Sequence, residues 1–277
     1  MSDEILQEPK ERHPKLRVTE IAGRSYSYVW ENRSLLAVPL IFVFAIQFIF
    51  ALFAPSNGGP KPGLSDLPLI MGLSVASIIC LMAFAVGVHR TVLLQDVRTG
   101  FAFLRWDANF RRYARTWLTV FVMTLVVVTI AILAMTIAVK TGAGKPNATI
   151  GVVIIALAIP MAVLLPRLSL AFPAAAVGEL EPIRHSWRVT KGSVLRLLAA
   201  FILATLPFLF FGFLLAIPTF FAALMIKLVP NVALAMKSLG YAFMAVNAAL
   251  KALSTAILTV TLSLSYDALA RQPGSPE

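Results

Sequence analysis

Polar side chains interrupt the last apolar block of the chain at regular intervals. Spacings of four, three, seven and four residues place them on one narrow face of a helix: Asn247, Lys251, Ser254, Thr261 and Ser265. A charged residue inside an apolar helix points to function, because burying its charge in lipid is costly. This face predicts a substrate path or an intramembrane site for a lipid head group. The alternative is that Ser and Thr bond neighbouring helices while Lys251 extends toward the membrane surface.

Aromatic and basic residues gather before three other apolar blocks. Trp rings prefer the depth of lipid head groups, and Lys and Arg side chains at that depth face phosphates. The predicted head-group or interfacial residues are Trp30, Arg33, Arg112, Arg115, Trp117, Trp187, Arg188, Lys191 and Arg196. The alternative is the general enrichment of such residues at any membrane surface.

Signatures of catalysis and metal binding are missing from the sequence. It contains no Gly-x-Ser-x-Gly elbow, no Gly-x-x-x-x-Gly-Lys loop and no His-Glu-x-x-His pair. The histidines, His13, His89 and His185, lie in different segments, and the single cysteine, Cys80, has no partner. The sequence therefore predicts no enzyme, no metal and no cofactor.

Six long apolar blocks must position these residues. Of the 277 residues, 59% are hydrophobic and only 13% are charged, which predicts a membrane protein. Because a membrane-spanning helix needs about 20 apolar residues, we expect an all-α, polytopic bundle of six transmembrane helices. The helices are expected at 35–54, 67–88, 116–139, 149–166, 194–224 and 240–266. They form a membrane domain over 35–268, between an N-terminal tail with an interfacial helix (1–34) and a C-terminal tail (269–277).

The segments between these blocks alternate in their content of Lys and Arg. They carry six, one, six, two, five, two and one such residues in chain order, when Arg196 at the start of the fifth span is counted with the segment before it. Since basic loops stay on the cytoplasmic side, both termini are predicted to be cytoplasmic. The net charge of +11 lies beside apolar helices, which favours anionic lipid head groups over nucleic acid as the partner.

The three basic segments share a design that suggests a threefold repeat of interfacial helix and helical hairpin. In the first, Val18, Ile21, Ala22 and Val29 fall on one side of a helix that would lie in the membrane interface. In the second, Asp107 is a predicted N-cap. In the third, Pro182 suits a first helical turn and Gly192 a helix end.

The third segment also carries a family resemblance. The stretch His185-Ser-Trp-Arg-Val-Thr-Lys-Gly-Ser193, followed by Arg196-Leu-Leu, resembles a motif of a broad, poorly characterised group of bacterial six-helix inner-membrane proteins. That group includes the membrane domain fused to some glycerophosphodiester phosphodiesterases. The resemblance covers about twenty residues and implies a bacterial inner-membrane location. It implies no enzyme activity, because this sequence has no phosphodiesterase domain.

These observations favour a non-enzymatic accessory or scaffold protein of the bacterial envelope. Its basic face would be held against anionic lipids, and another membrane or envelope protein would be its partner. The alternative is a transporter or lipid-handling permease that uses the polar face around Lys251. A lipid-modifying enzyme is the least favoured function, because no nucleophile, base or metal set is recognisable.

Overall fold

The computed structural model describes residues 17–53, 63, 65–104, 106–140, 158, 161–228 and 233–270. These residues form eight α-helices and one short 3-10 helix, with no strand among them. In chain order the elements are α1 (Val18–Glu31), α2 (Arg33–Phe53), α3 (Leu67–Leu94), η1 (Gly100–Phe103), α4 (Ala108–Lys140), α6 (Ala171–Val177), α7 (Pro182–Val189), α8 (Val194–Leu228) and α9 (Ala233–Ala270). The predicted all-α class is confirmed.

Five of these helices, α2, α3, α4, α8 and α9, are long and apolar enough to cross a membrane. The chain is therefore a multi-pass membrane protein. Each of the five contains most of one predicted span, and four of them extend well beyond it. Most of the remaining predicted span, 149–166, lies outside the described residues. Its last part belongs to a shorter apolar helix, Met161–Val177.

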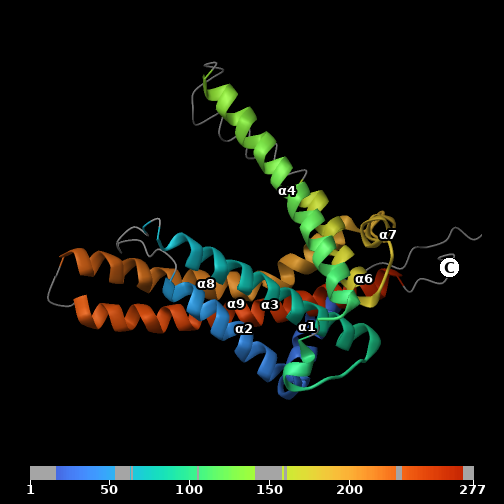
Figure 1. Cartoon of the computed structure of the whole chain (residues 1–277), viewed down its shortest axis with the longest axis horizontal. Coiled ribbons are helices and arrows are strands. Elements are labelled where there is room, and N and C mark those ends of the chain that lie inside the picture. Colours follow the sequence, from blue (N-terminus) through green and yellow to red (C-terminus); the bar gives the residue numbers. More distant parts are fainter. Residues whose placement is uncertain are drawn as a thin grey trace, which may run out of the picture.

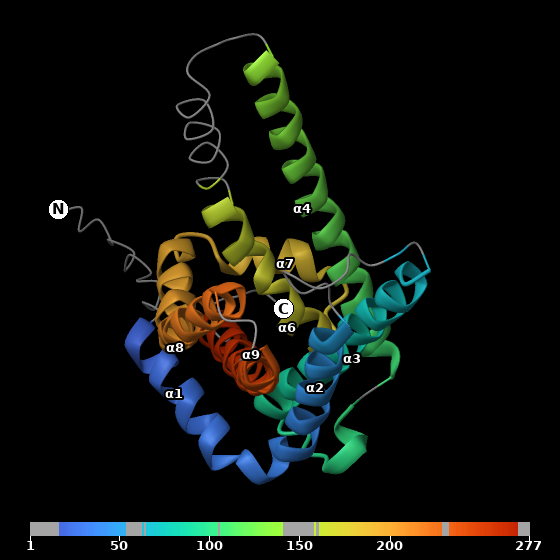
Figure 2. The same ribbon diagram turned by 90° about the vertical axis from the view of Figure 1, so that its left-hand side faces the viewer.

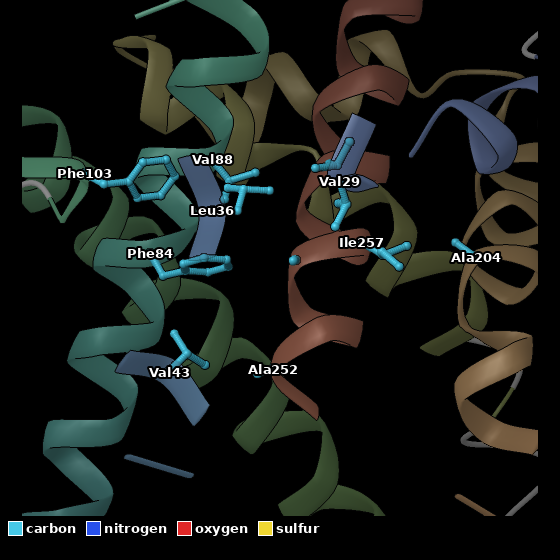
Figure 3. Packing of buried hydrophobic residues seen from close by; sticks show 11 residues of the cluster. Val29, Leu36, Val43, Phe84, Val88, Phe103, Ala204, Ala252 and Ile257 are labelled. Atoms are coloured by element: carbon cyan, nitrogen blue, oxygen red, sulfur yellow. The ribbon is translucent and has the colours of Figure 1, made fainter. Parts of the chain in front are cut away.

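Helix α9 forms the centre of the bundle (Figures 1 and 2), because α1, α2, α3 and α8 all pack against it. Its buried alanines at a spacing of four residues, Ala248, Ala252 and Ala256, allow these close approaches. Figure 3 shows the resulting core, in which Leu36 of α2, Phe84 of α3 and Ile257 of α9 meet. The helix that carries the predicted polar face, α9, thus also contributes buried apolar residues to the core.

Helix α1 confirms the helix predicted in the first basic segment, but its apolar face packs against protein. Ile21, Ala22 and Val29 are buried, and α1 contacts both α8 and α9. The hydroxyl of Tyr26 donates a hydrogen bond to the carbonyl oxygen of Ala204 in α8 at 2.6 Å. Burial raises the pKa of Tyr26, so its hydroxyl remains a donor. The expectation that this face lies in lipid is wrong, because α8 and α9 cover it.

The second basic segment differs from the other two. A turn at Asn32 separates α1 from α2, and Gly192, with a φ of +80°, lies between α7 and α8. No such break separates Phe110 and Arg115 from the apolar part of α4, since no Gly or Pro occurs between Ala108 and Lys140. The predicted N-cap is confirmed, because Asp107 Oδ1 accepts from the backbone N–H groups of Asn109 and Phe110 at 3.0 and 3.1 Å. The expected threefold repeat of separate interfacial helices is therefore incomplete.

Helix α4 departs from the direction of α2, α3, α8 and α9 and projects away from them (Figures 1 and 2). Only its first turns are held by α3 and α6. Tyr113 and Thr116 are buried there, whereas no side chain of residues 117–137 is buried. The start of α4 is thus fixed in the protein, whereas residues 117–137 are half-buried or exposed.

Candidate functional site

A groove of about 990 Å³ lies between the first turns of α4 and the short helix α7. Four arginines line it, two from each helix, and Trp187 lies among them. Other lining residues are Thr116, Thr119, Leu180, Glu181 and Ile183. The groove arginines are Arg112, Arg115, Arg184 and Arg188. We call this site the basic groove.

The α4 side of the groove is fixed by Arg112. Its guanidinium donates to the carbonyl oxygen of Gly178 at 2.6 Å and to Asn109 Oδ1 at 3.4 Å. Gly178 ends α6 with a φ of +105°, a left-handed conformation that favours glycine and turns the chain toward α7. One side chain thus joins α4 to the turn that precedes α7, and sets the separation of the two groove walls.

The α7 side is fixed through Trp187 and its neighbour. The Arg167 guanidinium lies 4.6 Å from the centre of the Trp187 ring, within the range of a cation–π contact. Ser186 donates a hydrogen bond to the carbonyl oxygen of Arg167. These contacts tie α7 to the helical segment before α6, while 44% of Trp187 remains exposed toward the groove and its surroundings.

The groove retains positive charge that the protein does not neutralise. Among the described residues, Glu181 is the only carboxylate that lines it, and Glu181 pairs with Arg184 at 3.1 Å. Arg115 and Arg188 are exposed and form no ion pair with a described residue. Two guanidinium groups are therefore available to an anion, and their planar fork fits the oxygens of a phosphate or a carboxylate.

An apolar cleft of about 310 Å³ follows the basic groove along α4. Val120 lines the cleft and lies one helical turn after Thr116 of the groove, which places it about 6 Å farther along the same face. On the opposite wall the lining includes Pro166, the residue before Arg167. Its other lining residues include Leu165, Phe172, Leu198 and Phe201. The one hydroxyl in the lining, that of Ser169, donates to the Pro166 carbonyl at 2.8 Å, so the cleft presents an apolar surface.

No protein family, curated protein or solved structure matches this chain. Its function is therefore inferred from the geometry of its own residues. Within the part of the chain that the structure describes, no three His, Cys, Asp or Glu side chains gather as they would to hold a metal ion.

The nine predicted head-group residues divide between the groove and other places. Arg112, Arg115, Trp187 and Arg188 line the groove. Trp30 and Arg33 stack on each other at the junction of α1 and α2, at 4.9 Å. Trp117 stacks on Phe121 within α4. Lys191 lies just before α8, and Arg196 lies in the first turn of α8. Arg184 was missed as a site residue, although it lies one helical turn before Arg188 and so shares its face.

The predicted polar face of α9 divides into two parts. Asn247, Lys251 and Ser254 line a second cleft, of about 350 Å³, whereas Thr261 and Ser265 are buried. Thr261 donates to the hydroxyl of Ser25 in α1 at 2.9 Å. The same buried end of α9 holds Ser263, whose hydroxyl lies 2.7 Å from Nδ1 of His89 in α3. The part of the face near the basic segments thus joins helices, and the part around Lys251 borders open space.

Proposed function

We propose that this protein binds an anionic phospholipid in the basic groove and apolar cleft, and that it is a non-enzymatic accessory or scaffold component of a bacterial inner membrane. The observation that carries the proposal is the order in which the basic groove and the apolar cleft follow each other along α4. Unpaired arginines come first and an apolar cleft follows about one helical turn farther on. This order matches the order of phosphate and acyl chain in a phospholipid.

The chemistry of each part fits one part of the lipid. Arg115 and Arg188 would bind the phosphate oxygens, and Trp187 would lie at the depth of the head groups. An acyl chain would pack against Val120 and Phe201. Basic pockets between membrane helices on the cytoplasmic side bind acidic head groups in this way.

The proposed setting is a six-span protein with both termini in the cytoplasm. The alternation of basic segments supports this orientation. The resemblance of residues 185–193 to a motif of bacterial inner-membrane proteins supports the location. In the scaffold role, the basic end of the bundle would hold anionic lipids beside another envelope protein, without nucleic acid and without a cofactor.

A lipid-handling permease is the second candidate, and the cleft beside Lys251 favours it. A permease needs a polar path that continues past this cleft. Among the described residues of α9, the positions after the cleft are packed: Ala256, Ile257 and Val260 are buried, and Thr261 is bonded to Ser25. The scaffold function is therefore the better supported of the two.

The groove is tested by removing its two unpaired arginines. We expect R115Q/R188Q to weaken binding of phosphatidylglycerol to the purified protein about thirtyfold, with little change for phosphatidylcholine. Each lost charge-assisted bond near a membrane surface contributes about 1 kcal/mol. Binding is measured by native mass spectrometry or by lipid titration in detergent.

The matched control is R111Q/K191Q, which removes the same charge. Arg111 lies on α4 and Lys191 just after α7; both are exposed, and neither lines the groove. Equal weakening by the two double variants would show that only the overall charge of this end matters, and would overturn the groove as the site.

A further inference from the structure

The cleft beside Lys251 has no role in the function proposed above, and it lies in a different part of the bundle. It is lined by residues of α2, α8 and α9, and α2 and α8 both pack against α9 (Figure 2). Six of its ten lining residues are polar: Gln47, Thr205, Asn247, Lys251, Ser254 and Thr255. So many polar groups in the middle of three apolar helices call for a ligand.

The cleft lies far from the basic groove along the membrane normal. Gln47 comes fourteen residues after Arg33, the first residue of α2, a rise of about 21 Å. Lys251 comes twelve residues before Ser263, the contact of His89, a rise of about 18 Å. With a hydrocarbon layer of about 30 Å, both residues lie in the half of the bilayer opposite the basic segments.

Several polar groups of the cleft are already satisfied by the protein. Gln47 Nε2 donates to Ser77 Oγ at 3.2 Å. The hydroxyl of Thr205 donates to the Phe201 carbonyl, and that of Thr255 to the Lys251 carbonyl, each at 2.8 Å. These groups form part of the walls of the cleft. The remaining polar side chains of the lining are the ones with free capacity to bind a ligand.

Three side chains of α9 keep free hydrogen-bonding capacity. Asn247, Lys251 and Ser254 line the cleft at helical spacing and make no side-chain hydrogen bond or ion pair with a described residue. An ammonium, an amide N–H and a hydroxyl on one face can donate to the oxygens of a single anion. Lys251 has no carboxylate beside it in the described structure, so a bound anion would supply the missing counter-charge in a region of low dielectric constant.

We propose that the Lys251 cleft binds the phosphate group of a phospholipid from the leaflet opposite the basic groove. Lys251 bonds the phosphate as a point charge, and Asn247 and Ser254 donate to its other oxygens. The apolar lining residues Phe208, Leu209 and Leu250 contact the lipid chains. A free phosphate ester would offer the same oxygens without chains, so the two sources are separable by experiment.

The test measures phosphatidylglycerol bound to the full chain by native mass spectrometry. It uses the R115Q/R188Q background, so that binding at the basic groove is weakened and contributes less to the signal. We expect K251Q to lower the occupancy of the remaining lipid adduct at least fivefold. K140Q, which removes an exposed lysine at the end of α4, should leave it unchanged. K251R keeps the charge and should retain the adduct, which also shows that the fold tolerates substitution at this position.

Competition with glycerol phosphate distinguishes the source of the phosphate. A large excess should leave the lipid adduct in place, because the soluble ester lacks chains that contact Phe208 and Leu209. Displacement at concentrations comparable to those of the lipid would show a solute site and overturn the lipid assignment. Retention of the adduct by K251Q would overturn the site itself, whatever the result at the basic groove.

Discussion

Arg112 differs from Arg115 and Arg188 of the basic groove because its guanidinium is already bonded to the protein. Its 2.6 Å bond to the Gly178 carbonyl joins residues that are 66 positions apart in the sequence. Arg115, one helical turn farther, is exposed and forms no ion pair with a described residue. At the scale of single residues, the same side-chain type therefore bonds the protein at one position and is left exposed, in the lining of the groove, at the next.

This difference predicts that substitution of Arg112 destabilises the protein, whereas substitution of Arg115 does not. R112Q should lower the apparent Tm of the detergent-purified protein, since a hydrogen bond from a charged donor to a partly buried carbonyl contributes about 1.5 kcal/mol. R115Q should leave the Tm within error of the wild type, because it removes no contact within the described structure. Thermal unfolding followed by intrinsic fluorescence measures both variants. A larger loss of Tm in R115Q than in R112Q would contradict these roles.

At the scale of elements, the loop between α3 and α4 depends on a glycine. The ring of Phe103 in η1 is almost fully buried against α3. A Cβ added at Gly87 would lie only 2.6 Å from the Phe103 carbonyl oxygen. The absence of a side chain at Gly87 thus lets η1 approach α3, and this approach helps set where α4 begins.

We expect G87A to destabilise the protein by about 1–3 kcal/mol, because overpacking must displace the backbone of η1. G72A is the matched control on the same helix: a Cβ there meets nothing within 4 Å. It should be neutral or stabilising by up to about 1 kcal/mol, from the higher helix propensity of alanine. Apparent Tm values in detergent compare the two, and a neutral G87A would show that η1 moves away without cost.

The elements also show which parts of the fold follow from sequence. Asp107 and Gly192 act on the backbone within a few residues, so their roles as N-cap and helix end were predictable. The bonds from Tyr26 to Ala204 and from Thr261 to Ser25 join residues 178 and 236 positions apart. Hydrophobic periodicity predicts which face of a helix is buried but not which helix covers it. For this reason the sequence predicts that the apolar face of α1 lies in the membrane interface, and it does not predict that the polar face of α9 divides into a packed part and a part that lines a cleft.

At the scale of the whole molecule, two polar sites lie at different depths with a packed core between them. The basic groove lies at the start of α4, and the Lys251 cleft lies in the opposite half of the bundle. Leu36, Phe84 and Ile257 belong to this core (Figure 3), and Val260 is part of the same buried cluster. Lipids bound at both depths would therefore be held beside the protein rather than passed through it, which suits a scaffold.

The predicted orientation of this assembly can be tested with single cysteines. The chain has one native cysteine, Cys80, so C80S supplies a cysteine-free background. Gly63 and Lys140 should lie outside the cytoplasm, and Val97 and Lys191 inside; all four are exposed in the structure. With 33 residues, α4 is about 50 Å long and can cross a hydrocarbon layer of about 30 Å even when strongly tilted. A membrane-impermeant maleimide added to intact cells should therefore label G63C and K140C and leave V97C and K191C unlabelled until the cells are lysed.

Labelling of K140C together with protection of K191C would require the chain to recross the membrane between them, as expected of the predicted span at 149–166. Equal accessibility of these two positions would rule out that span, and the even number of crossings with it.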